Sequence, residues 1–117
     1  MKQILERGDI ALLIDAFYAK VKQDDLLAPL FSHVDWPHHL PVIYDFWSSI
    51  LLGDQSYKRN PFEKHRDLPV TPAHFNRWLL HFERTVDEHF EGEKAEEAKQ
   101  RANSIAGIFQ HKLGLLK

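Results

Sequence analysis

The sequence predicts an all-α fold, and three observations lead to this expectation. Apolar residues recur at helical spacing along most of the 117 residues, and no stretch alternates as a half-buried strand would. Signals that start or stop helices divide the pattern, with Thr71-Pro72 at a start and Gly53 and Gly114 at ends. Apolar residues (44%) and charged residues (27%) balance as in a globular domain, so we expect one domain over residues 1–117.

The first half of the chain should contain two long helices joined by a turn. The first is expected over residues 9–22, with Ile10, Ile14, Phe17, Tyr18 and Val21 on one face. Pro29 limits residues 27–31 to one tight turn. The second helix should begin after Asp35 and end before Gly53, where it carries on one side His39, Ile43, Phe46, Trp47 and Ile50.

Proline flanks His39 on both sides, at Pro37 and Pro41. Because proline cannot donate a backbone hydrogen bond, Pro41 is expected to kink the second helix or delay its start. The His39 side chain could then swing toward or away from the centre of the fold.

The second half of the chain should contain two further helices. Residues 53–60 read as a loop and residues 61–66 as one short helical turn. The third long helix starts at Thr71 and buries Phe75, Trp78, Leu79, Phe82 and Val86. The last runs over residues 93–113, with an inner face of Ala98, Ala102, Ile105, Ala106 and Phe109. Residues 53–70 hold little apolar surface, so something should fill the space between the second and third helices.

Charge and composition exclude several classes of function. The net charge is −2 with basic and acidic residues interleaved, which disfavours nucleic-acid binding. Without cysteine the chain cannot form disulfides or attach haem covalently through Cys-x-x-Cys-His. No apolar run approaches the ~20 residues of a membrane span, and the N-terminus turns charged too early for a signal peptide. We therefore expect a cytoplasmic protein that does not bind membranes.

His65 is the most informative residue, because it lies in a short segment bounded by Pro61 and Pro69. Phe62 and Leu68 would fall on the same side as its imidazole. His39 comes from a different element, and both histidines should face an aromatic cavity. Such an arrangement can hold a flat iron cofactor, with His65 as the metal ligand and the rings against the porphyrin.

Tyr18, His39 and Trp78 are candidate ligand-binding residues. Each carries an O–H or N–H group that needs a partner when it is buried. Donors that converge on a diatomic ligand with a partly negative outer atom would act as an oxyanion hole does.

Plainer interpretations compete with this one. A lone histidine is usually a surface or structural residue, and a tryptophan at helical spacing is usually core. The chain could then be a cofactor-free all-α interaction module. Helix-borne zinc and di-iron sites fit poorly, because neither His-x-x-x-His nor Glu-x-x-His occurs in the sequence.

Taken together, residues 10–112 resemble a group III truncated haemoglobin, a small globin with a two-over-two helical sandwich. The segments that carry the resemblance are, in order, residues 17–21 (FYAKV), 29–31 (PLF), 44–53 (YDFWSSILLG), 65–69 (HRDLP) and 75–79 (FNRWL). The absence of a Gly-Gly turn between the first helices, typical of other truncated groups, agrees with group III.

The resemblance implies a role for individual residues. His65 matches the proximal iron ligand, while Tyr18, His39 and Trp78 match the distal residues that face a bound ligand. Phe31, Ile43, Trp47, Phe62 and Leu68 are expected to line non-covalent haem b. The implied ligands are O2, NO or CO, with a redox partner for iron reduction. Tight oxygen binding with NO dioxygenase-like or peroxidase-like detoxification is expected, rather than oxygen transport.

Overall fold

The structure is a computed structural model that describes residues 2–32, 34–54 and 70–112. Its elements are α1 (Arg7–Gln23), the short 3-10 helix η1 (Ala28–Phe31), α2 (Trp36–Leu52), α4 (Pro72–His89) and α5 (Glu93–Lys112). The all-α prediction is confirmed. Within the described ranges, the strand-like pairing is a single bridge between Lys2 and Phe90.

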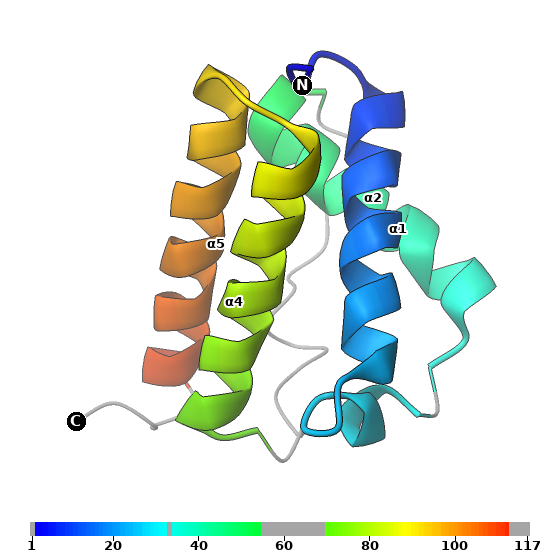
Figure 1. The fold of residues 1–117 in the computed structure, drawn as a ribbon, viewed down its shortest axis with the longest axis vertical. Coiled ribbons are helices and arrows are strands. Elements are labelled where there is room, and N and C mark those ends of the chain that lie inside the picture. The colour runs from blue at the N-terminus through cyan, green and yellow to red at the C-terminus, as the bar shows by residue number, and fades with distance from the viewer. Residues whose placement is uncertain (1, 33, 55–69, 113–117) are drawn as a thin grey trace.

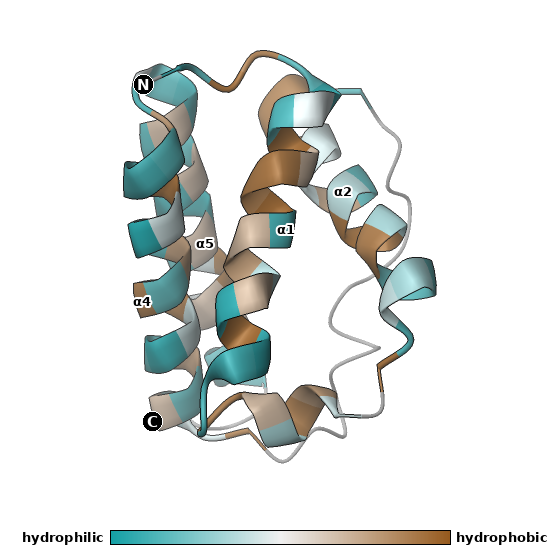
Figure 2. Cartoon of the chain, turned by 45° about the vertical axis from the view of Figure 1, so that its right-hand side comes forward, coloured by the Kyte–Doolittle hydropathy of each residue, from teal (hydrophilic) through white to brown (hydrophobic). Residues whose placement is uncertain are grey.

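The helices form two layers. α4 packs along α5, and α1 lies against both α2 and α4 (Figure 1). The pair α1–α2 therefore covers the pair α4–α5, which is the expected two-over-two arrangement. Figure 2 shows the hydrophilic side of α4 turned away from the other helices. Among the described helices, none is long and apolar enough to cross a membrane.

Local sequence signals explain most helix ends. The α2 helix ends at Gly53, whose φ of +70° is the left-handed conformation that glycine adopts without strain. In α4, Pro72 takes the first position, and Thr71 and His74 cap each other reciprocally. Pro29 lies in the first turn of η1, which stays short as expected.

One expected helix start was wrong, whereas the expected start of the second helix after Asp35 was correct. α1 begins at Arg7 rather than at residue 9, because Glu6 and Asp9 form a capping box ahead of the expected start. α2 is not delayed by Pro41: it begins at Trp36 and continues through the proline. The expected loop over residues 53–60 lies beyond Asp54 outside the described residues, as do the turn over residues 61–66 and Gly114.

Alanines allow α4 and α5 to approach closely. Ala95, Ala98, Ala102 and Ala106 are all buried on α5, whereas Ile105 and Phe109 are only half-buried. The prediction for the inner face of α5 is therefore correct for Ala98, Ala102 and Ala106, and Ala95 belongs to this face as well.

This close contact leads to a stability prediction. Ala102→Leu should lower the free energy of unfolding by about 1–3 kcal/mol, because a larger side chain at a fully buried position forces its neighbours apart. Urea unfolding would measure the change. Ala19→Leu, the same replacement at an exposed position in α1, is the control and should change stability by less than about 0.5 kcal/mol. Equal effects of the two replacements would contradict the tight α4–α5 contact.

Candidate functional site

The described residues include Tyr18, Phe31, His39, Ile43, Trp47 and Trp78 among the expected site residues. His65, Phe62 and Leu68 lie outside the described residues, so the expected metal ligand and its neighbours keep the status of predictions.

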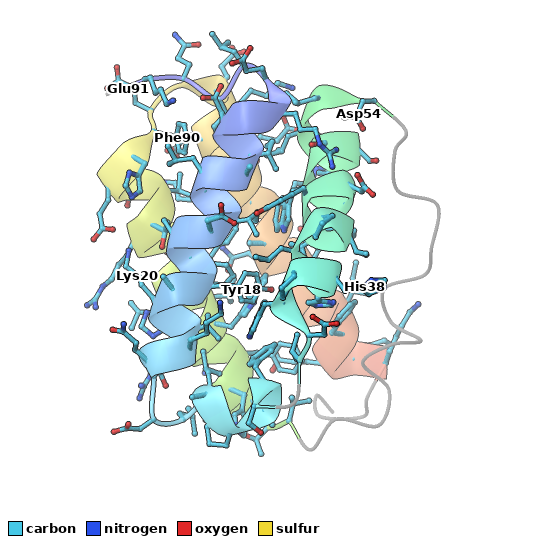
Figure 3. All side chains as sticks on the ribbon, turned by 90° about the vertical axis from the view of Figure 1, so that its right-hand side faces the viewer. Tyr18, Lys20, His38, Asp54, Phe90 and Glu91 are labelled. Atoms are coloured by element: carbon cyan, nitrogen blue, oxygen red, sulfur yellow. The ribbon has the colours of Figure 1, made fainter. Side chains whose placement is uncertain are left out.

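Tyr18 lies at the centre of an aromatic cluster. It projects from α1 into the space between α1 and α2 (Figure 3) and is 9% exposed. Its ring centroid lies 4.6 Å from that of Phe17, 5.1 Å from Trp36 and 6.0 Å from Phe31. Burial raises the pKa of Tyr18 to about 12, against the opposing effect of a hydrogen bond with the Trp78 side chain. The phenol therefore keeps its proton at any physiological pH.

Trp78 reaches the same place from α4. The indole packs edge-on against Phe17 at 5.5 Å and stacks on Phe82 at 5.7 Å. Because an indole N–H can only donate, the Tyr18 oxygen accepts the hydrogen bond between them. The Tyr18 O–H is then available for a further acceptor.

His39 lies in the first turns of α2 and is half-buried. Its ring packs edge-on against Trp36 with a centroid distance of 5.9 Å. The neighbouring His38 is exposed and lies on the outer side of α2 (Figure 3). As expected for adjacent helical residues, the two histidines differ in direction, and His39 is the one on the aromatic side.

Trp36 connects these residues and was not predicted as a site residue. Its ring lies between Tyr18, Phe31 and His39, at 5.1, 5.9 and 5.9 Å. The Lys22 ammonium lies 4.5 Å from the same ring, at cation–π distance. Trp36 precedes His39 by one helical turn, and this spacing could have indicated that the two side chains lie on the same side of the helix. It was missed because residue 36 was expected only as the start of the helix.

The expected cofactor-lining residues occupy different depths. Trp47 is buried, 3% exposed, and stacks on Phe82 at 4.8 Å, which places it in the core between α2 and α4. Phe31, at the end of η1, and Ile43, on α2, are half-buried and pack against the core. The structure thus brings Tyr18, Trp78, Phe31 and, through Trp36, His39 into one aromatic region, with Trp47 behind it.

Comparison with known proteins identifies the family to which the chain belongs. The family model of the bacterial-like globins matches residues 5–111. The chain belongs to this globin family. It is 35% identical over 118 residues to the group 3 truncated hemoglobin ctb of Campylobacter jejuni, covering 95% of this chain and 93% of the relative. A group 1 truncated hemoglobin, GlbN of Nostoc commune, is 26% identical over 105 residues, covering 88% and 89%.

A solved structure agrees with the sequence comparison. The crystal structure of a group III truncated hemoglobin from Campylobacter jejuni matches this globin with a TM-score of 0.88 and 36% identity. The match covers 97% of this chain and 95% of the other. The resemblance to group III truncated haemoglobins is confirmed. As a globin, the chain binds diatomic ligands through a haem cofactor.

The described residues fit such a cofactor. A porphyrin needs apolar walls, and Phe31, Trp36 and Ile43 supply half-buried apolar surface around one region. A bound diatomic ligand with a partly negative outer atom is stabilised by a hydrogen-bond donor, and the protonated Tyr18 phenol can serve as one. Haem supplies the iron at which the ligand binds, while these side chains supply the surroundings.

Proposed function

We propose that this globin is a b-type haem protein that binds oxygen tightly and acts in detoxification of the NO dioxygenase or peroxidase type, rather than in oxygen transport. The observation that carries the proposal is the contact between Tyr18 and Trp78. In the proposal, His65 ligates the iron, and Phe31, Ile43, Trp47, Phe62 and Leu68 line the haem. Tyr18, His39 and Trp78 face the ligand, and a separate redox partner in the cytoplasm reduces the iron.

The arrangement of donors supports tight binding. The Trp78 side chain can only donate in its hydrogen bond with Tyr18, which leaves the Tyr18 O–H to be directed at the ligand in the proposal. Each hydrogen bond to a charged or partly charged acceptor contributes about 1.5–3 kcal/mol. Since ~1.4 kcal/mol corresponds to a factor of ten, one such donor should slow ligand release about ten- to a hundredfold. Slow release suits chemistry on the bound ligand better than delivery to another protein.

Loss of His65 is the first test of the proposal. Purified protein supplied with haem should show a Soret absorption band, and His65→Ala should weaken it strongly, because the iron would lose its protein ligand. Absorption spectra of the ferric and ferrous forms measure this. His38→Ala, at an exposed histidine of α2, is the control and should leave the band unchanged. A protein that stays colourless with haem would refute the proposal as a whole.

Loss of the donors is the second test. Tyr18→Phe removes the O–H that we direct at the ligand, so oxygen should dissociate about ten- to a hundredfold faster. Trp78→Phe should act in the same direction, because the phenol loses the donor that orients it. Stopped-flow displacement of oxygen by carbon monoxide gives both rate constants.

Tyr44→Phe provides the matched control for Tyr18→Phe. The Tyr44 hydroxyl donates to Asp15, and this exposed contact joins α1 to α2. Its loss should leave oxygen dissociation unchanged. If Tyr18→Phe and Tyr44→Phe gave the same rate as the unmodified protein, Tyr18 would not be a ligand donor.

A further inference from the structure

Asp24 is a buried carboxylate at the end of α1 that the proposed ligand chemistry does not use. It is the first residue after α1 and is 8% exposed. Its Oδ1 accepts hydrogen bonds from the backbone N–H groups of Leu26 at 2.8 Å and Leu27 at 3.1 Å. This oxygen therefore stabilises the turn that leads into η1.

The second oxygen of Asp24 bonds to α4. Oδ2 accepts from Arg77 Nη1 at 2.8 Å and lies 2.6 Å from His81 Nε2. Arg77 and His81 are one turn apart on α4, and Trp78 belongs to that turn. One carboxylate thus fixes the end of α1 to the part of α4 that carries the indole.

Electrostatics indicate that Asp24 is ionised. Burial raises its pKa, but hydrogen bonds from His81, Arg77 and the two backbone amides lower it more, so the pKa lies well below its usual range. Because a carboxylate only accepts, His81 Nε2 carries the hydrogen in its contact with Oδ2. A buried charge with four donors holds its partners in one geometry.

We propose that Asp24 is a positioning residue for the ligand site: through Arg77 and His81 it fixes the register of α4 against α1, and so holds the Trp78 indole against the Tyr18 phenol. The expected effect on oxygen dissociation rests on the proposed function, whereas the position of the Trp78 indole relative to the Tyr18 phenol does not. Lys20 also joins these helices, through Thr85 and Glu88, but at a later turn of α4. The ion pair of Asp24 involves Arg77, the neighbour of Trp78 in the chain, and His81, one turn later.

Asp24→Asn tests the contacts of Asp24 with α4 separately from its contacts with the backbone. The remaining carbonyl oxygen can still accept from Leu26 and Leu27, while the new amide group would turn its hydrogens toward Arg77 and His81. The amide would then face the Arg77 guanidinium, which cannot accept, whereas His81 Nε2 could accept only after its hydrogen moved to Nδ1. The link to Arg77 would be lost and the link to His81 weakened. We expect oxygen to dissociate about three- to tenfold faster than from the unmodified protein, and no faster than from Trp78→Phe.

Asp9→Asn is the matched control. Asp9, at the other end of α1, is 7% exposed, and one of its oxygens accepts from the backbone N–H groups of Leu5 and Glu6. Its other oxygen lies 2.9 Å from Lys2 Nζ. The replacement removes the same kind of group and a similar ion pair, but far along α1 from Tyr18. It should lower thermal stability and leave oxygen dissociation unchanged.

A double-mutant cycle tests whether Asp24 acts through Trp78. In the Trp78→Phe background, Asp24→Asn should add little further increase in the dissociation rate, because the indole it positions is already gone. A dissociation rate equal to the product of the two separate factors would overturn the proposal. So would an Asp24→Asn protein that folds and releases oxygen at the unmodified rate while Trp78→Phe releases it faster.

A second readout does not depend on oxygen. In the carbon monoxide complex, the Trp78 indole N–H gives an NMR signal that can be assigned by its absence in Trp78→Phe. Asp24→Asn should shift this signal and speed its hydrogen exchange, whereas Asp9→Asn should not. An unchanged signal in Asp24→Asn would overturn the proposal.

The design also keeps the two proposals apart. If Trp78→Phe does not alter oxygen dissociation, the donor assignment in the proposed function fails, while the NMR signal still tests Asp24. If Asp24→Asn does not fold, Arg77→Met replaces it. The Arg77 side chain is 44% exposed, and its replacement removes one of the two bonds between Asp24 and α4. The indole signal should then shift in the same direction by a smaller amount, and its failure to move would refute the proposal.

Discussion

The packing of α1 against α4 is the constraint on which the rest of the molecule depends. Phe17 is fully buried and meets Phe82 and Trp78 edge-on, at 5.2 and 5.5 Å. Since Phe82 and Trp78 stack on each other, the ring of Phe17 fits against both at once. Tyr18 is the next residue of α1, so this apolar contact also determines where its hydroxyl lies. The position of the proposed ligand donor is in this sense a consequence of core packing.

Polar contacts then restrict the small movements of the helices that the apolar contact still allows. Aromatic packing tolerates small rotations and shifts along a helix axis, whereas a hydrogen bond weakens steeply with misalignment. Asp24 and the pair Tyr18–Trp78 add such directional contacts between the second half of α1 and the first half of α4. Apolar burial provides the larger share of stability, and the few buried polar contacts select one arrangement from several similar ones.

The sequence was sufficient to predict the four long helices and, apart from Trp36, the main residues of the aromatic cluster. The helical repeat of apolar residues and the effects of proline and glycine depend only on nearby sequence. They therefore allowed a correct prediction of the end of α2 at Gly53 and the start of α4 after Thr71. The meeting of Tyr18 with Trp78 was also expected, because each lies on the inner face of an amphipathic helix.

Contacts between distant charged residues were not predictable in the same way. Asp24 and Arg77 are 53 residues apart, and each resembles an ordinary surface charge in the sequence. Only the packing of α1 on α4 makes them partners. Trp36 was missed for a related reason, since its role depends on Lys22 and Tyr18 from another helix. His65 remains a prediction from its motif.

The acidity of Tyr18 bears on which detoxification chemistry suits the site. With a pKa of about 12, the phenol donates a hydrogen bond but gives up its proton reluctantly. Heterolytic cleavage of a peroxide moves a proton from one peroxide oxygen to the other, so a peroxidase-like reaction needs a group that both accepts and releases a proton. His39 is the residue that we propose for the ligand site from α2, and its ring packs against Trp36, which also contacts Tyr18. Reaction of bound oxygen with nitric oxide needs no such proton. In the proposed function Tyr18 therefore serves as a hydrogen-bond donor, and a peroxidase-like reaction would rely on another side chain, of which His39 is the proposed one, to move the proton.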